Sequence, residues 1–198
     1  MKWTEGIIAR AIALQTLARK CVVLVDNCNW TGRECDVLGV TTDLRIIDVE
    51  VKISRADLKA DAKKDKWWER KFLGWGPDVE VRNEAGRMIR VTRERLEQTT
   101  ARPWPPKVWK HYYAMPAEIW KPELLDCLAS TRSGVILLRE QRHGAIAVAE
   151  VVRRATPNKD AERIKPEDVI DIARLANLRM WEAYHQRDAA RRKQLEPA

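Results

Sequence analysis

The sequence contains no uninterrupted apolar run of the roughly 20 residues that a membrane-spanning helix needs. Its longest apolar stretches, near residues 21–25 and 135–138, are only as long as a β-strand. An apolar segment follows the first lysine, but Glu5, Arg10 and Gln15 interrupt it and no small-residue cleavage site comes after it. This is not the pattern of a secretory signal peptide. We therefore expect a cytoplasmic protein with no membrane partner.

Paired cysteines are also missing. The four cysteines, Cys21, Cys28, Cys35 and Cys127, form no C-x-x-C pair, and the three histidines do not stand at zinc-finger spacing. A disulfide scaffold is typical of small secreted domains that cannot build a sufficient core. We interpret the cysteines as reduced, packed thiols, and expect neither a disulfide framework nor a structural zinc site.

Acidic residues are in the minority, with 29 against 37 lysines and arginines, which gives a net charge of +8. A basic protein of this size commonly binds a polyanion, and nucleic acid is the first candidate. Charge alone is equally compatible with a basic protein that has no such partner, because the clustering of charge matters more than its total. The length of 198 residues suits a single domain that carries one insertion.

Hydrophobic periodicity predicts an α/β domain with a central mixed sheet flanked by helices. Apolar residues at helical spacing predict a first helix over residues 4–19, with Thr4 as its N-cap, and a long final helix that begins at Pro166. A charged helix is expected over residues 55–66 and a short one over residues 122–128. Strands are predicted over residues 21–25, 34–40, 45–53, 111–115, 135–139 and 145–152.

Residues 67–110 differ in composition from the rest and suggest a tryptophan-rich insertion or subdomain. They hold five of the nine tryptophans: Trp67, Trp68, Trp75, Trp104 and Trp109. A hairpin is expected from residues 79–82 and 88–91, with helical turns over residues 93–98. We favour the interpretation that the tryptophans form a small core of this insertion. The alternative is that some stack on unpaired bases, in which case Trp67, Lys66 and Arg70 would contact nucleic acid.

One group of charged residues has the spacing of a catalytic site. Asp36 lies on one predicted strand, and Asp48-Val-Glu50-Val-Lys52 forms the next. Because side chains alternate along a strand, Glu50 and Lys52 share one face, and two adjacent strands would set Asp36 beside Glu50. Asp48 shares this face too, and for it we expect a solvent-exposed pair with an arginine. Two carboxylates and an ammonium therefore converge on one patch.

These groups are suited to metal-assisted hydrolysis of a phosphodiester. Mg²⁺ binds through one or two carboxylates, keeps several waters and takes a substrate phosphate oxygen. The metal lowers the pKa of a bound water, and a lysine beside it stabilises the developing negative charge. The main-chain carbonyl of Val51 is a further candidate ligand. However, a Glu-x-Lys pattern on a strand is more often a solvated cross-strand charge pair, so the spacing alone does not decide.

The order of elements and several motifs resemble the PD-(D/E)XK nuclease superfamily. More narrowly, the chain resembles the MmcB-related proteins, a group associated with DNA repair. In that group an E-V-K strand is followed by a serine, and then by a helix with two aspartates and a lysine. The matching residues here are Glu50, Lys52, Ser54, Asp57, Asp61 and Lys63. The aromatic strand of the group corresponds to residues 112–116, and its closing helix to residues 173–175.

The resemblance departs from the group in two places that bear on the site. The Lys-Trp pair expected after the second aspartate is Lys63-Lys64 here, with Trp67 displaced. Residues 67–110 have no counterpart in the group.

The resemblance implies a restriction-endonuclease-like fold and a nuclease, with an endonuclease role in DNA repair, recombination or defence. It implies that Asp36 and Glu50 bind Mg²⁺ or Mn²⁺, that Lys52 is the catalytic lysine, and that Lys63 contacts phosphate. Many members of the wider superfamily have a glutamate on the first helix, so Glu5 is a candidate distal ligand. The alternative for Glu5 is an ordinary acidic residue of a first helical turn.

DNA is the favoured partner, and a homodimer is compatible with a double-strand cutter. The rival interpretations are a non-catalytic nucleic-acid-binding module or a protein-interaction module on the same fold.

Overall fold

The computed structural model describes residues 2–141 and 144–195 of the chain. Its centre is a six-stranded mixed sheet in the order β1-β2-β3-β6-β7-β8. The strands are β1 (Cys21–Cys28), β2 (Cys35–Thr41), β3 (Ile46–Val51), β6 (Lys110–Pro116), β7 (Gly134–Gln141) and β8 (Gly144–Arg153). β3, β6 and β7 run parallel, and the other neighbouring pairs are antiparallel. The predicted mixed α/β architecture is confirmed.

Helix α1 (Glu5–Ile12) covers one face of this sheet. It begins as predicted, because the Thr4 side chain accepts the backbone N–H of Ile7 and caps the first turn. The helix then continues as a π-helical segment over Ala13–Leu17. Ile8 and Ile12 are fully buried and pack against a cluster that includes Val49 of β3.

The opposite face of the sheet is covered by α2 (Arg55–Asp61) and two 3-10 turns, η2 (Asp65–Trp67) and η3 (Pro122–Cys127). Leu58 and Trp67 pack there against Tyr113 of β6. Ser54 caps α2 by accepting the N–H of Asp57 at 3.1 Å. α2 begins as predicted but ends at Asp61, before the predicted residue 66, and the chain then turns so that η2 lies over the sheet.

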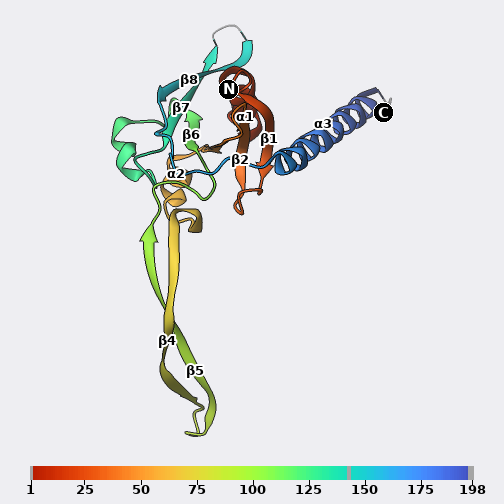
Figure 1. The fold of residues 1–198 in the computed structure, drawn as a ribbon. Coiled ribbons are helices and arrows are strands. Elements are labelled where there is room, and N and C mark those ends of the chain that lie inside the picture. The colour runs from red at the N-terminus through yellow and green to blue at the C-terminus, as the bar shows by residue number, and fades with distance from the viewer. Residues whose placement is uncertain (1, 142–143, 196–198) are drawn as a thin grey trace.

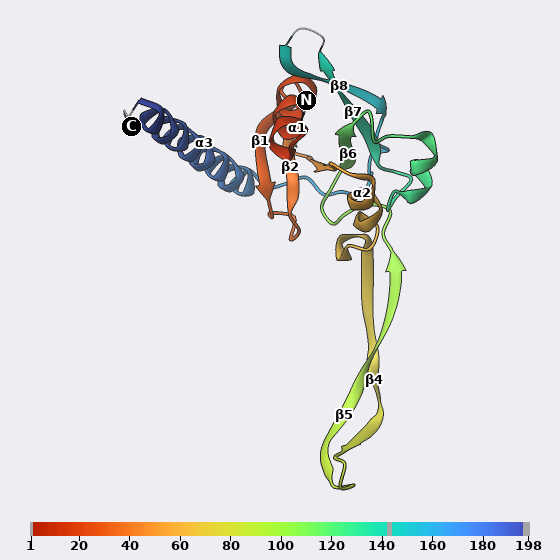
Figure 2. The ribbon, with the colours of Figure 1, turned by 180° about the vertical axis from the view of Figure 1, so that it is seen from behind.

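The last helix, α3 (Pro166–Leu195), packs its buried apolar residues against the body within its first half. Ile172 is buried there, and Val169 and Ala176 pack in the same cluster as Val25 of β1. The rest of α3 projects away from the sheet (Figures 1 and 2). Among the described residues, no helix is both long and apolar enough to cross a membrane.

A long hairpin extends from the body in a different direction (Figures 1 and 2). It consists of β4 (Trp68–Arg82) and β5 (Met88–Ala101), which pair antiparallel as a separate two-stranded sheet. The strands predicted at residues 79–82 and 88–91 are its far ends. The helical turns predicted over residues 93–98 are wrong. The ladder with β4, in which Gly74 pairs with Leu96, overrides the helical propensity of this charged stretch.

The tryptophans do not form a core of their own, so the favoured prediction for them is wrong. Trp67 is 1% exposed and belongs to the core of the body. Trp104 donates its indole N–H to the carbonyl of Thr156 at 2.9 Å, and Trp109 packs with the α1 cluster. Trp75 is 59% exposed on the hairpin. A two-stranded ribbon has no interior in which to bury such side chains.

The close approach of β6 and β7 gives a test of this sheet. A Cβ atom on Gly134 would lie 2.3 Å from Cδ1 of Tyr112 and 2.7 Å from the backbone N of Ala155. We therefore expect Gly134→Ala to lower the free energy of unfolding by about 2 kcal/mol, measured by urea denaturation. The control is Gly6→Ala on α1, where nothing lies within 4 Å of the added carbon. Equal loss of stability in the two variants would contradict the packing described for Gly134.

Candidate active site

Glu50 and Lys52 point into the face of the sheet opposite α1. The predicted alternation holds, since Val49 and Val51 pack on the α1 side. Glu50 is 1% and Lys52 is 2% exposed, because α2 and η2 cover this face. The alternative of a solvated charge pair is therefore wrong for these two side chains. A buried carboxylate and ammonium need partners to offset their desolvation.

Asp36 lies on β2 next to Glu50. Val37 pairs with Val49 in the antiparallel register, so the neighbouring residues Asp36 and Glu50 also lie opposite each other on the two strands. The Asp36 carboxylate accepts the N–H of Val51 at 2.6 Å. Burial and the nearby charge of Glu50 raise the pKa of Asp36 to about 6. Within the described ranges, no basic side chain forms an ion pair with Asp36.

Three ammonium groups surround Glu50. Lys52 Nζ lies 3.0 Å from Glu50 Oε2, and Lys64 Nζ lies 3.4 Å from the same oxygen. The buried ammonium of Lys66 contacts the other carboxylate oxygen. Burial alone would raise the pKa of Glu50, but the charges of Lys66 and Lys52 outweigh it and hold that pKa below its usual value. Glu50 is therefore ionised and fully engaged.

Asp61, at the end of α2, is the second acceptor for the same lysines. Its Oδ1 lies 3.1 Å from Lys52 Nζ and 3.0 Å from Lys64 Nζ. Its Oδ2 accepts the Tyr113 hydroxyl at 2.6 Å and the Trp67 indole N–H at 3.0 Å. Although burial opposes ionisation, the charges of the lysines hold the pKa of Asp61 well below its usual range. Asp61 and Glu50 thus both contact the Lys52 ammonium and together fix its position.

A second buried layer lies beside this cluster and corrects the prediction for Asp48. Asp48 is 1% exposed and pairs with no arginine; its Oδ2 lies 3.8 Å from Nε2 of His111 on β6. Burial raises the pKa of Asp48 to about 7. His111 forms a hydrogen bond of 2.9 Å between Nδ1 and the Ser133 hydroxyl, and burial lowers its pKa well below the usual value. The sheet pairing of Asp48 with His111 brings the two together.

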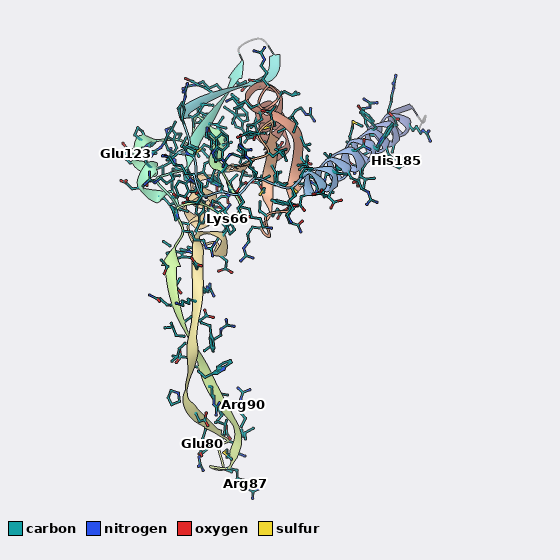
Figure 3. All side chains as sticks on the ribbon, in the orientation of Figure 1. Lys66, Glu80, Arg87, Arg90, Glu123 and His185 are labelled. Atoms are coloured by element: carbon teal, nitrogen blue, oxygen red, sulfur yellow. The ribbon has the colours of Figure 1, made fainter. Side chains whose placement is uncertain are left out.

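The residues predicted to contact nucleic acid lie in different environments. Lys63 is exposed just after α2, and Arg70 is exposed and forms a 2.7 Å ion pair with Asp65. Lys66 and Trp67 are 3% and 1% exposed and point into the cluster. Neither is accessible without opening the core, so their burial argues against direct contact with nucleic acid. Figure 3 shows Lys66 where the hairpin meets the body.

The candidate metal ligands form a pair rather than a larger group. In the described part of the chain, no three or more His, Cys, Asp or Glu side chains gather into a group that could hold a metal ion. Glu5 is exposed on the first turn of α1, which packs on the other face of the sheet, so it does not join Asp36 and Glu50. The candidate carbonyl of Val51 lies at the end of β3.

Asp36 and Glu50 nevertheless fit Mg²⁺, which needs only one or two protein carboxylates and completes its shell with water. The charge of Glu50 disfavours ionisation of Asp36, and Asp36 has no ion-pair partner among the described residues. Lys64, with a side chain 50% exposed, is the most accessible of the three ammonium groups beside Glu50. Of the three ammonium groups, that of Lys64 is therefore the one that a divalent cation on Glu50 could displace without opening the core.

Three members of this cluster, Lys64, Lys66 and Tyr113, are not predicted by the spacing of Asp36, Glu50 and Lys52. One signal was present: a lysine followed by a tryptophan does occur after Asp61, at Lys66-Trp67, three residues later than the resemblance expects. The turn η2 brings this pair back over the sheet.

We find no matching protein-family model and no matching curated protein. The chain is similar in structure to the SPO1766 protein of unknown function from Silicibacter pomeroyi, with a TM-score of 0.49 and 20% sequence identity. That similarity covers 100% of this chain and 98% of the other. At this level it decides neither the fold family nor the function.

The buried state of His111 predicts a pH dependence of stability. As pH falls through about 6.5, the unfolded chain protonates this residue while the folded protein does not. The associated stability is present above that pH and is lost below it, by about 2 kcal/mol at pH 5. The raised pKa values of Asp48 and Asp36 act in the opposite direction over the same range, because these carboxyls take up protons in the folded protein before they do in the unfolded chain. The test is therefore the difference between variant and wild type: on going from pH 7.5 to pH 5.0, the free energy of unfolding measured by urea denaturation should change about 2 kcal/mol more favourably for His111→Gln than for wild type. His185→Gln, on the exposed end of α3 (Figure 3), is the matched control and should keep the wild-type profile.

Proposed function

We propose that the protein is a metal-dependent nuclease that hydrolyses DNA phosphodiester bonds, acting in repair, recombination or defence. One observation carries the proposal: a buried Lys52 is held between Glu50 and Asp61, beside an Asp36 that has no ion-pair partner in the described ranges. Strongly shifted pKa values of this kind cluster at functional sites. The resemblance to PD-(D/E)XK nucleases assigns roles to three of these residues.

In the proposed reaction, Asp36 and Glu50 hold Mg²⁺ or Mn²⁺, with the Val51 carbonyl as a candidate third ligand. When bound, the ion supplies an activated water and neutralises charge on the phosphate. Lys52 keeps its proton, because Glu50 and Asp61 raise its pKa despite burial, and it stabilises negative charge developing on the phosphate oxygens. Asp61 is a positioning residue that acts through Lys52.

The accessible side chains near η2 support a nucleic-acid track that enters from the hairpin side. Arg33, Asp65, Trp68 and Arg70 line an open pocket of about 200 Å³. Trp68 is 39% exposed, so it replaces the buried Trp67 as the aromatic able to stack on an unpaired base. Exposed Lys63 supplies positive charge for phosphate contacts, and Arg70 would add to it on exchanging its ion pair with Asp65 for a phosphate.

A second function, a nucleic-acid-binding module without catalysis, is favoured by one observation. Three ammonium groups already neutralise Glu50 and Asp61. If Lys64 does not leave, the cluster is a structural ion-pair network.

The nuclease proposal predicts cleavage of labelled single-stranded, duplex or branched DNA with Mg²⁺ or Mn²⁺. Lys52→Ala and Glu50→Gln should each lower the rate by about 100-fold or more, because the first removes the ammonium that stabilises charge on the phosphate and the second removes a charged metal ligand. The matched control is Glu123→Gln, the same chemical change at an exposed site on η3. RNA is included as a substrate. If the folded wild type cuts nothing and both variants still bind nucleic acid, the non-catalytic module is the better description.

Removal of the Lys64 ammonium should strengthen metal binding. We expect Lys64→Ala to bind Mn²⁺ roughly three- to tenfold more tightly than wild type, because the half-exposed ammonium competes for the same space. Titration calorimetry measures this independently of turnover. Lys63→Ala removes the same charge from the neighbouring exposed position and should leave the affinity near that of wild type. An equal effect of both substitutions would show that only net charge matters and that Lys64 does not occupy the cation position.

A further inference from the structure

The hairpin exposes more apolar surface than an isolated ribbon is expected to keep in water. Nine of its large apolar side chains are between 39% and 62% exposed: Trp68, Phe72, Leu73, Trp75, Val79, Met88, Ile89, Val91 and Leu96. A two-stranded hairpin alone is marginally stable, and larger sheets are needed for independent stability. Contiguous exposed apolar patches usually mark interaction sites. The hairpin therefore has the character of an interface.

The two edges of the hairpin differ in how well each could pair with an additional β-strand. The β4 edge contains Gly74 and Pro77 and two irregularities, between Phe72 and Gly74 and between Trp75 and Asp78. β5 contains neither proline nor glycine, and its ladder shifts only near the tip. In the part of the chain that the structure describes, β5 forms a ladder with β4 alone, so its outer edge has no strand beside it. An uncovered edge of this length is a template for another strand.

Charge identifies the occupant of this edge. Residues 68–101 hold seven basic and six acidic side chains, so they contribute one of the eight net positive charges of the chain. Several of the arginines are already neutralised by ion pairs, such as Arg93 with Asp78 and Arg95 with Glu97. A nearly neutral surface of this kind is better suited to binding the same surface of a second copy than to binding a polyanion. The rest of the chain, with a net charge of +7, would repel a second copy.

Two charges on β5 fix the register of such pairing. Arg90 and Glu94 are the β5 charges that form no ion pair within the described residues. In an antiparallel pair of identical strands centred on Thr92, Arg90 lies opposite Glu94 of the partner subunit, and a two-fold axis repeats the contact. The same register sets Met88 opposite Leu96 of the partner subunit and places no like charges opposite each other along β5. It also keeps each tip alongside the hairpin of the other copy.

We propose that β5 pairs antiparallel with β5 of a second copy about Thr92, so that two hairpins form a four-stranded sheet. Cross-strand pairs of opposite charge stabilise a sheet, and like charges directly opposite destabilise it. Arg90 lies on the far part of the hairpin (Figure 3), away from the candidate active site. The proposal is therefore independent of the nuclease assignment.

A charge-swap experiment tests both the partner and the register. Arg90→Glu places two glutamates opposite each other twice in a homodimer, and Glu94→Arg does the same with two arginines. We expect each variant alone to raise the dimer Kd by about tenfold or more, measured by sedimentation velocity of the full chain. An equimolar mixture of the two variants restores opposite charges and should dimerise like wild type. A wild-type chain that stays monomeric at tens of micromolar would overturn the proposal, as would a mixture no better than its components.

Cross-linking gives a second measurement that does not depend on the charge variants. Thr92→Cys sets two sulfurs across the axis, where opposed Cα atoms of an antiparallel pair lie about 4.5–5.5 Å apart. We expect this variant to form a disulfide-linked dimer on mild oxidation. Thr99→Cys, on the same strand but seven positions from the axis, should not. Equal cross-linking of the two variants, or of the parent chain with its four cysteines, would contradict the register.

Discussion

The ion-pair cluster of Glu50 and Asp61 with Lys52, Lys64 and Lys66 is the interaction on which the rest of the body depends. Removing one partner of a buried ion pair costs about 3–5 kcal/mol because the other charge is left uncompensated. The turn η2 exists in this form because Lys66 must reach Glu50 and Trp67 must reach Asp61. Placement of η2 over the sheet in turn closes the core around Tyr113.

The same cluster determines what chemistry is available. Lysines that neutralise a carboxylate pair stabilise the fold, yet they occupy the space that a divalent ion would need. Their burial is unequal: Lys52 and Lys66 are enclosed, whereas Lys64 is half exposed. The enclosed lysines therefore hold the geometry of the site, whereas the half-exposed lysine is the one that a ligand can displace. This division connects the electrostatics of folding with the proposed catalysis.

Sequence patterns predicted the parts of the structure that depend on local periodicity. The alternation of residues 47–52 follows from side-chain direction along a strand. The Thr4 cap follows from the capping preference of a threonine before an apolar helical pattern, and the pairing of the strands that carry Asp36 and Glu50 follows from their short connection. The burial of the polar side chains of β3 could not be predicted in this way. Whether they meet water depends on η2, and η2 is held in place by contacts with residues distant in the sequence. Asp48 and Trp67 were misassigned for this reason. Residues 93–98 were misassigned because pairing with β4 outweighs local propensity.

In the described part of the chain, the hairpin joins the body at its base, where the Arg102 N–H donates to the Trp67 carbonyl at 2.8 Å. The length of the hairpin can therefore change without affecting the packing of the body. Inserting or deleting residue pairs near the tip would move that tip by about 3.3 Å per pair without repacking any residue of the core. The number of residues in β4 and β5 therefore sets the distance between the body and whatever the outer part of the hairpin contacts. This distance can change without any change in the geometry of the buried charges.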